Sequence, residues 1–188
     1  KEMKNRYNPS NPKSLMLRFH TQTAGFTLTA QQPENNITRT SLQALAAVIG
    51  GTQSLHTNSM DETLALPSEK AAEIALRSQQ IIAFESGATN VIDPLGGSWY
   101  VEQLTNDIEK EVYRYFDKID KQGGVVESIE NGYFQREISQ ASSEYQRKVD
   151  NFERYIVGVN KFVKEDESID IPILEIGEEV QKEQIEKL

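Results

Sequence analysis

The chain has 188 residues, of which 37% are hydrophobic and 26% are charged, so it can bury the core of one ordinary domain. Its 29 acidic residues outnumber its 20 basic ones and give a formal net charge of -9, which argues against a nucleic-acid or anionic-membrane surface. It has no cysteine, which excludes disulfides and thiolate metal sites and fits the reducing cytoplasm, the location that we expect.

The sequence opens with a polar stretch interrupted by proline, KEMKNRYNPSNPK, for which we predict a loop over residues 1–13. Residues 14–22, SLMLRFHTQ, alternate as a strand and place Arg18, His20 and Gln22 on one face. Core strands carry aliphatic side chains in such positions. This face is therefore predicted to meet either water or a cavity that holds something polar.

Two further strand–helix pairs follow the first strand. In chain order we predict a helix capped by Asn35 or Asn36 and stopped by Gly50-Gly51, a strand over 52–58, a helix from Pro67-Ser68 to Gly87, a strand over 89–93, and a helix of about 20 residues after Tyr100. Three strand–helix units in a row are typical of a parallel sheet with crossover helices, an α/β architecture. Because three parallel strands alone lack neighbours, we predict that residues 1–100 are the last three units of a (β/α)8 TIM barrel. The other strands would come from a preceding segment of the same polypeptide.

The rest of the sequence is predicted to be an appendage to these units. Residues 101–162 are expected to form a helical C-terminal extension of the same domain, broken at Gly123-Gly124 and ending in the strand-like YIVGVNKF, residues 155–162. Residues 163–188 are predicted to be a charged linker or tail, with the acidic stretch KEDESID, a short IPILEI and a helix over EEVQKEQIEKL.

Four stretches are more specific than the order of strands and helices, which any barrel of this kind shares. They are RFHTQTAGFTLTAQQPENNITRT (residues 18–40), GGTQSLHTNSMDETLALP (50–67), DPLGGSWYVEQLTNDI (93–108) and YIVGVNKF (155–162). Together they resemble the catalytic barrel of the methylmalonyl-CoA mutase family and its acyl-CoA mutase relatives, over about residues 10–165. The resemblance implies that the chain is the C-terminal part of the barrel domain of a large, catalytic subunit.

Members of this family are adenosylcobalamin-dependent isomerases, so the resemblance implies a radical carbon-skeleton isomerisation of (R)-methylmalonyl-CoA and succinyl-CoA. The cobalt of this vitamin B12 cofactor would be held by a domain or small subunit outside the chain, because the family's DxHxxG cobalt-ligating signature occurs nowhere in it. The N-terminal part of the barrel and a GTPase chaperone are further expected partners, and the chain alone is expected to be inactive. No membrane partner is expected, because no apolar run reaches the roughly 18 residues of a span and no secretory signal opens the sequence.

Two alternatives stay open at this point. The first is a sister enzyme, isobutyryl-CoA or 2-hydroxyisobutyryl-CoA mutase, which differs mainly in strands outside this chain. The second is a non-catalytic assembly role, in which the chain docks the cobalamin subunit or a GTPase chaperone.

In this family the pantetheine arm of the acyl-CoA passes through the middle of the barrel, which would account for the polar strand face. A thioester with amides and hydroxyls needs matching partners, because an unpaired buried polar group costs about 1–3 kcal/mol. The implied substrate-binding residues are His20, Gln22, Gln53, Ser54 and His56. For His56, packing of the strand end is an equal alternative. No residue of the chain is assigned a catalytic role.

The implied cofactor-binding residues follow the first two strands. They are Gly25, Phe26, Asn58, Glu62, Thr63 and Leu66. Phe26 stands where the family commonly carries tryptophan, so an aromatic plane is kept and the indole donor is lost. Thr63 stands where the family often has alanine. Glu62 has a structural alternative, since acidic residues also favour the first turn of a helix.

No metal site is predicted, because two histidines without cysteine do not make a zinc site. Arg18, Arg39, Asp61 and Asp93 are interpreted as members of structural ion pairs instead of catalytic acids. Gly96-Gly97-Ser98 is a weak match to the phosphate cradle that barrels place after their last strands. Because the CoA nucleotide lies toward the other end of the barrel in this family, we interpret this motif as a turn and a helix start.

Overall fold

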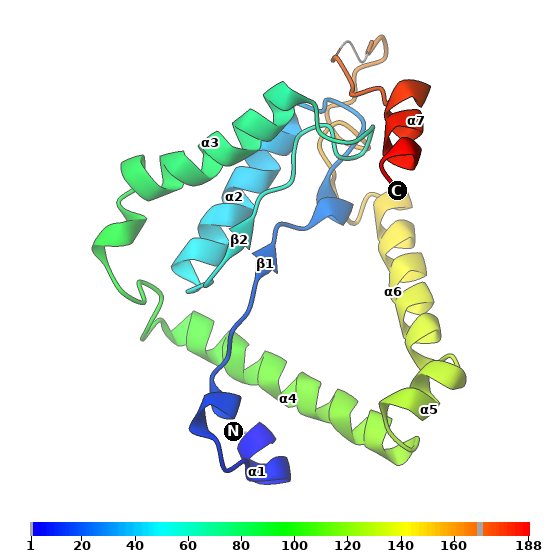
Figure 1. The fold of residues 1–188 in the computed structure, drawn as a ribbon. Coiled ribbons are helices and arrows are strands. Elements are labelled where there is room, and N and C mark those ends of the chain that lie inside the picture. The colour runs from blue at the N-terminus through cyan, green and yellow to red at the C-terminus, as the bar shows by residue number, and fades with distance from the viewer. Residues whose placement is uncertain (1, 169–170) are drawn as a thin grey trace. The chain divides into compact units, whose positions relative to one another are not determined.

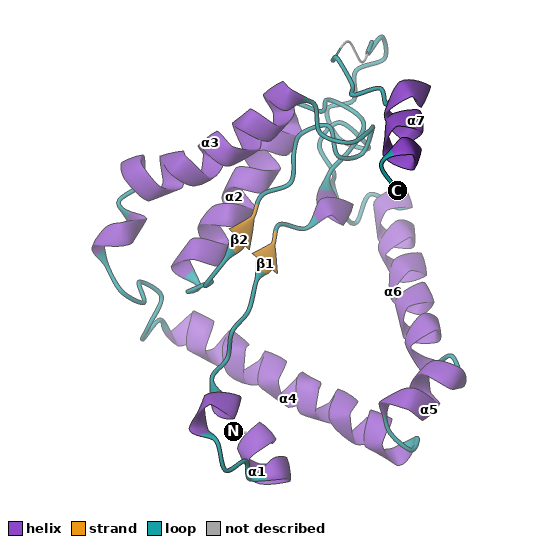
Figure 2. Ribbon diagram, in the orientation of Figure 1, coloured by secondary structure: helices purple, strands orange, loops and turns teal. Residues whose placement is uncertain are grey.

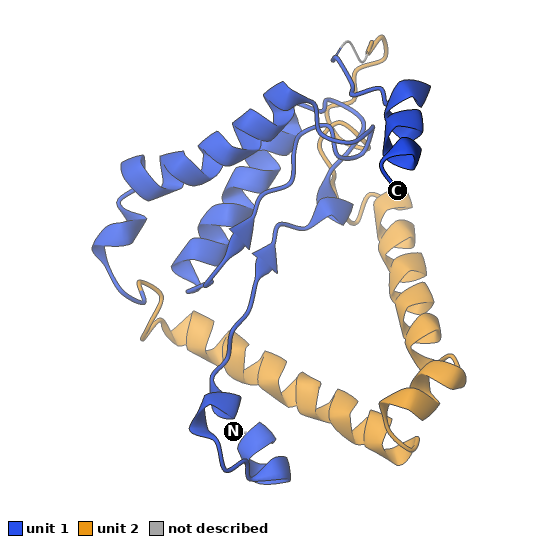
Figure 3. Cartoon of the chain, viewed as in Figure 1, with its two compact units in different colours: residues 1–93, 171–188 blue, residues 94–170 orange. Residues whose placement is uncertain are grey.

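Helices make up most of the structure, a computed structural model that describes residues 2–168 and 171–188 (Figure 1, Figure 2). The elements are, in chain order, α1 Glu2–Tyr7, η1 Pro12–Leu15, β1 Thr21–Gln22, η2 Gly25–Thr27, α2 Asn35–Ile49, β2 Leu55–His56, α3 Glu69–Glu85, η3 Ala88–Asn90, α4 Trp99–Lys121, α5 Val125–Glu130, α6 Tyr133–Asp150 and α7 Glu178–Glu186, where η marks a short 3-10 helix. They fall into two compact units, residues 1–93 with 171–188 and residues 94–170 (Figure 3).

The first unit contains a parallel strand pair joined by a helix. β1 pairs with β2 in a register that sets Thr21 opposite Leu55 and Gln22 opposite His56, and α2 makes the crossover between the strands (Figure 1). α3 follows β2 and packs against α2. Parallel strands need a long crossover, usually a helix, so this order of strand, helix, strand and helix agrees with the predicted α/β class.

Local sequence sets the ends of α2 and α3. The Ser68 hydroxyl accepts a hydrogen bond from the Ala71 backbone N–H at 3.3 Å, which satisfies a free donor in the first turn of α3. Gly50 follows the last residue of α2, as predicted. The predicted cap of α2 by Asn35 or Asn36 is wrong, because Glu34 holds the cap position without a side-chain hydrogen bond among the described residues, and Asn36 bonds to neighbouring loops.

The core of the first unit is small and rich in polar side chains. Its buried apolar residues are Leu28, Ala44, Met60, Ala71, Ala75 and Ile82. Its buried polar residues are Thr23, Thr29, Asn36, Thr40, Thr57, Asn58, Ser59, Asp61 and Ser78. Buried polar groups are nearly always hydrogen-bonded in stable proteins. Hydrogen bonds of Thr23, Asn36 and Asn58 join the loops after the two strands, whereas Thr40 Oγ1, Ser59 Oγ and Asp61 Oδ1 have no partner among the described residues.

The predicted strands are only partly correct. Each of the first two is reduced to the two residues of β1 and β2. The strand predicted over residues 89–93 is wrong, because η3 covers its first residues and, in the described part of the chain, β2 pairs with β1 alone. A strand forms a ladder only with a neighbour, and among the described residues none is aligned with this stretch. The loop predicted over residues 1–13 is wrong in part, because α1 lies within it.

The second unit is built on three consecutive helices, α4, α5 and α6. The Ser98 hydroxyl accepts a backbone hydrogen bond in the first turn of α4, so Gly96-Gly97-Ser98 is the predicted turn and helix start. The predicted break at Gly123-Gly124 is confirmed between α4 and α5. There Gly124 adopts φ 100° and ψ -171°, a conformation that is essentially open to glycine only.

The strand-like prediction for residues 155–162 is wrong, since this stretch forms a compact turn with a single bridge. The Asn160 side chain accepts a hydrogen bond from the Ile156 N–H at 2.7 Å and donates one to the Val149 carbonyl at 2.8 Å. An amide that satisfies nearby backbone groups in this way replaces the ladder that a strand would need.

In the C-terminal stretch, the helix predicted over EEVQKEQIEKL is confirmed as α7. Residues 171–176 are irregular and α7 follows them. Of the acidic stretch KEDESID, residues 164–168 are turn or irregular, and the last two residues lie outside the described ones. None of the helices in the described part combines the length and the apolar character that crossing a bilayer requires.

Candidate functional site

The strand pair, together with the residue before each strand, carries a row of exposed polar side chains. They are His20, Gln22, Ser54 and His56. Thr21 and Leu55, which alternate with them along the strands, are half-buried. Because side chains along a strand alternate between two faces, one face of the pair is polar and open while the other contributes to the core.

Hydrogen bonds join the polar residues of the two strand segments. His20 Nδ1 lies 2.8 Å from Ser54 Oγ, a hydrogen bond in which the tautomer of the ring decides which atom donates. Gln53 Oε1 accepts a hydrogen bond from the Phe19 N–H at 2.9 Å, and Gln53 Nε2 donates one to the Leu17 carbonyl at 3.2 Å. The Gln53 side chain therefore takes the place of a neighbouring strand for the extended residues before β1, because both the oxygen and the nitrogen of its amide are hydrogen-bonded to their backbone.

A chain of hydrogen bonds links the loops that follow β1 and β2. Thr23 Oγ1 donates to Asn58 Oδ1 at 2.7 Å and accepts from the Asn58 N–H at 2.9 Å. Gln22 Nε2 also donates to Asn58 Oδ1, at 3.3 Å, and Asn58 Nδ2 donates to Glu62 Oε1 at 2.5 Å. Three predicted site residues thus come together here, joined by Thr23, which the sequence did not single out.

Gly25 lies against this group of residues. A Cβ at Gly25 would lie 2.6 Å from Glu62 Oε1 and 2.9 Å from Asn58 Nδ2, so any larger residue would displace one of them. In the same two loops Phe26 is 80% exposed and Leu66 is 59% exposed. Exposed apolar side chains near an exposed carboxylate suit a flat, partly apolar ligand that also carries hydroxyl groups.

A hollow of about 210 Å³ lies beside the end of β2 and α3. His56, Ser59 and Glu62 contribute polar groups to its lining, and α3 contributes Ala72, Ala75 and Leu76. Thr63, the next residue after Glu62, is exposed. One predicted substrate residue and one predicted cofactor residue therefore line the same hollow.

Two buried residues hold the loops of this site and were not predicted to do so. Asn36 Nδ2 donates to the carbonyls of Thr29 and Met60, both at 2.9 Å, and links the two loops. The Asp61 carboxylate accepts a hydrogen bond from the Ser68 N–H at 2.9 Å, so its predicted ion pair is wrong among the described residues. The asparagine pair at the start of α2 was the available signal for Asn36, but asparagine near a helix start also indicates a cap.

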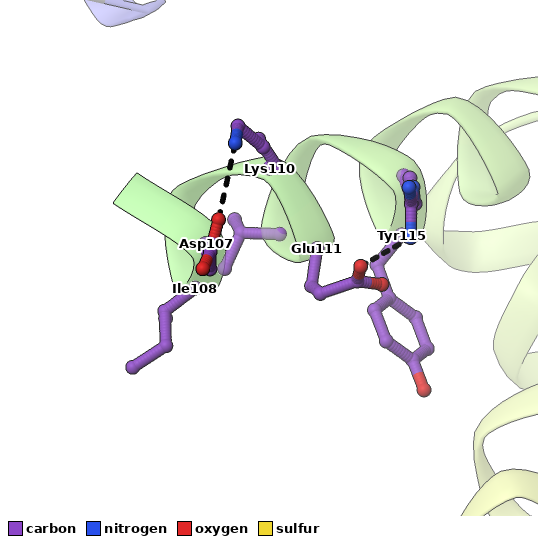
Figure 4. A pocket seen from close by; sticks show the side chains of 7 residues that line it. Asp107, Ile108, Lys110, Glu111 and Tyr115 are labelled. Atoms are coloured by element: carbon purple, nitrogen blue, oxygen red, sulfur yellow. Dashed lines mark hydrogen bonds and ion pairs between the residues drawn. The ribbon is translucent and has the colours of Figure 1, made fainter. Parts of the chain in front are cut away.

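A separate surface hollow on α4 contains none of the predicted site residues (Figure 4). Asp107 pairs with Lys110 at 3.0 Å, and Glu111 pairs with Arg114. Hydrogen bonds from Gln103 and from Lys110 hold the pKa of the Asp107 carboxyl below its ordinary value of 3.8. All of these groups belong to one exposed helix, where such pairs are ordinary surface features.

Comparison with known proteins identifies the family. The family profile described as "Methylmalonyl-CoA mutase" matches residues 1–188, the whole chain. The chain belongs to the methylmalonyl-CoA mutase family. This confirms the resemblance seen in the sequence.

Individual members of the methylmalonyl-CoA mutase family are 44–50% identical to the chain. The 2-hydroxyisobutanoyl-CoA mutase large subunit of Aquincola tertiaricarbonis is 50% identical over 173 residues, which cover 92% of this chain and 31% of that protein. The mitochondrial methylmalonyl-CoA mutase of Bos taurus is 46% identical over 181 residues, 96% of this chain and 24% of that protein. The methylmalonyl-CoA mutase large subunit of Streptomyces virginiae is 44% identical over 183 residues, 97% of this chain and 25% of that protein. The chain thus spans 24–31% of the length of these relatives.

Proposed function

We propose that this chain is part of an adenosylcobalamin-dependent acyl-CoA mutase, an isomerase that interconverts (R)-methylmalonyl-CoA and succinyl-CoA. Relatives named methylmalonyl-CoA mutase, 46% and 44% identical to the chain, support this proposal. Because the chain spans only a part of such proteins, the activity belongs to the complete enzyme, and the chain alone is inactive.

In this proposal residues 1–100 supply the last three units of a (β/α)8 barrel, residues 101–162 a helical extension and residues 163–188 a charged tail. The parallel pairing of β1 with β2 through the α2 crossover supports this arrangement. In the described part of the chain β2 pairs with β1 alone, so one edge of β2 is open to a further strand.

The observation that carries the proposal is the open polar face across β1 and β2. Packed barrel interiors are dominated by branched aliphatic side chains, whereas this face carries exposed histidine, glutamine and serine. Such groups suit the amides and hydroxyls of an acyl-CoA arm. The 2.8 Å contact between His20 and Ser54 holds the imidazole in one orientation, so that it can position the substrate.

The residues after the strands fit adenosylcobalamin. Gly25 leaves room for the Asn58 and Glu62 side chains beside it, and Phe26 and Leu66 offer exposed apolar surface to the corrin. The exposed Glu62 carboxylate can accept hydrogen bonds from ribose hydroxyls, with Thr63 next to it. When bound, the cofactor supplies the radical chemistry. The chain's own residues bind and orient it and exclude water from the site.

The proposed partners are the N-terminal part of the barrel, a cobalamin-binding domain or small subunit, and a GTPase chaperone of the mutase. An apolar stripe on α4 supports an extensive contact with other parts of the enzyme, because its members, Leu104, Ile108 and Val112, are all exposed. We also propose a cytoplasmic location, which the absence of cysteine supports and cell fractionation tests.

The test is an isomerisation assay of the complete enzyme with adenosylcobalamin. His20→Ala is expected to lower kcat/KM for the acyl-CoA about tenfold or more while the affinity for adenosylcobalamin stays within about twofold, because His20 contacts substrate and not corrin. Arg77→Ala, a change on the exposed face of α3, is the control. Parental activity of His20→Ala would remove this residue from the site. Partner binding by the complete enzyme without turnover of any acyl-CoA would favour the assembly role.

A second candidate function is a sister reaction on 2-hydroxyisobutyryl-CoA. The observation that favours it is the 50% identity to a 2-hydroxyisobutanoyl-CoA mutase large subunit. Comparison of kcat/KM for methylmalonyl-CoA, isobutyryl-CoA and 2-hydroxyisobutyryl-CoA in the complete enzyme separates these candidates.

A further inference from the structure

We infer that Thr23 is a positioning residue, which fixes Glu62 through Asn58 and so sets how tightly the adenosyl group of the cofactor is held. The inference rests on the proposed function, in which Glu62 meets that group. It goes further because Thr23 contacts no ligand in that proposal and acts through two other residues.

Thr23 is held in place by backbone pairing at the end of β1. Its N–H donates to the carbonyl of His56 at 3.1 Å and so extends the parallel ladder by one residue. Its side chain is buried, with 6% of the residue exposed. The position of the hydroxyl is therefore set by the pairing of the two strands and not by the loop that follows Thr23.

The Thr23 hydroxyl fixes the orientation of the Asn58 amide. It accepts from the Asn58 N–H and donates to Asn58 Oδ1, and Gln22 Nε2 donates to the same oxygen. Two donors on Oδ1 leave Nδ2 as the end of the amide that faces Glu62. A reversed amide would place Nδ2 against the Gln22 donor and Oδ1 against the Glu62 carboxylate, and Asn58 is only 2% exposed, so water cannot relieve these unfavourable pairs.

Glu62 depends on this amide for its position. Among the described residues, Asn58 is the one side chain that hydrogen-bonds to its carboxylate, at 2.5 Å. Glu62 is exposed, and a glutamate side chain without a partner samples several rotamers. Holding it in one of them costs conformational entropy, which the hydrogen bond from Asn58 offsets. Gly25 leaves the space that this single position requires, because a Cβ there would lie 2.6 Å from Glu62 Oε1.

The experiment compares binding of adenosylcobalamin and methylcobalamin to the complete enzyme. The two cobalamins share the corrin and differ in the ligand above cobalt, so the ratio of their Kd values reports contacts to the adenosyl group. Thr23→Val removes the hydroxyl and keeps the branched shape, and Thr23→Ser restores the hydroxyl. Thr57→Val is the matched control, because it removes another buried threonine hydroxyl, which donates to the Ala75 carbonyl at 2.8 Å.

Thr23→Val is expected to lower the preference for adenosylcobalamin about fivefold, with methylcobalamin affinity unchanged, because about 1 kcal/mol of net hydrogen bonding corresponds to such a factor. Thr23→Ser should recover most of the preference, and Thr57→Val should keep it. Added to Glu62→Gln, Thr23→Val should have no further effect, since both act on one contact. If Thr23→Val does not fold, Thr23→Ala provides the same comparison without placing a methyl group against Asn58.

A preference that falls in Glu62→Gln but not in the Thr23 variants would overturn the positioning role and leave the proposed function intact. An unchanged preference in Glu62→Gln itself would overturn the proposed role of Glu62 and the inference with it. Equal weakening of both cobalamins in Thr23→Val would show a purely structural role, which also overturns the inference.

Discussion

Gln53 serves the extended residues before β1 as a substitute for a neighbouring strand. Its amide bonds to the Phe19 N–H and the Leu17 carbonyl, and each such hydrogen bond contributes about 0.5–1.5 kcal/mol. We therefore expect Gln53→Ala to raise the hydrogen-exchange rate of the Phe19 amide about tenfold in the complete enzyme. Gln31→Ala, an exposed glutamine in the loop after β1, is the matched control and should leave this rate unchanged. Equal exchange rates at Phe19 in the Gln53→Ala and parental enzymes would show that the Gln53 side chain does not protect the Phe19 N–H.

At the same scale, the sequence predicts which side chains face outward but not which ones hold others in place. Alternation predicts His20 and Gln22 on one face, and both are exposed while Thr21 between them is half-buried. Thr23 and Asn58 meet only because β1 and β2 pair in one register, and no local pattern specifies that register. The polar face of the candidate site was therefore predictable, whereas the hydrogen bonds behind it were not.

At the scale of elements, helices follow the sequence prediction more closely than strands do. α3 begins after Ser68 and α4 after Ser98, because a serine cap acts within a single turn. The strands predicted over residues 89–93 and 155–162 are absent, because a strand is stable only with a neighbour's ladder. The alternation of polar and apolar residues along one segment does not indicate whether a second strand lies beside it to form the ladder.

Tyr115 of α4 hydrogen-bonds to Glu137 of α6 and makes the contact between these helices sensitive to pH. The hydroxyl donates to Glu137 Oε2 at 3.0 Å, and this hydrogen bond, together with the charge of the carboxylate, raises the pKa of Tyr115 above its ordinary value of 10.0. A raised pKa favours the neutral phenol in the folded chain. The contribution of this contact to stability is therefore complete below about pH 10 and is lost as the pH rises through the folded-state pKa.

An ultraviolet titration of tyrosinate absorbance in the folded chain measures this effect. Of the seven tyrosines, Tyr115 should contribute a component that titrates above pH 10.0, and Tyr115→Phe should remove it. Glu137→Gln should move the same component back toward 10.0, because it removes the negative charge and keeps the side-chain shape. A Tyr115→Phe curve that keeps its component above 10.0 would contradict the assignment.

At the scale of the whole molecule, the chain leaves much of its apolar surface in water. Among the described residues α4 buries none of its own, although the apolar stripe on α4, Leu104, Ile108 and Val112, recurs every fourth position along it. The core of the first unit is also small, with few large aliphatic side chains. Soluble monomers rarely expose contiguous apolar patches of this kind. Periodicity predicts such a stripe, but a local pattern does not indicate which surface, if any, covers it.

If the rest of the mutase covers the apolar stripe on α4, polar substitutions in the stripe should make the isolated chain less prone to associate and should make the complete enzyme less stable. Ile108→Gln combined with Val112→Gln removes apolar area, so the isolated chain should bind less of a hydrophobic dye and self-associate less. The complete enzyme should lose about 2–4 kcal/mol of stability, because two side chains that were buried on assembly become polar. Glu109→Gln with Asp117→Asn, two exposed changes on the same helix, is the control and should alter neither property. A complete enzyme that unfolds at the parental temperature, while its isolated chain loses dye binding, would show that the stripe faces solvent in the mutase.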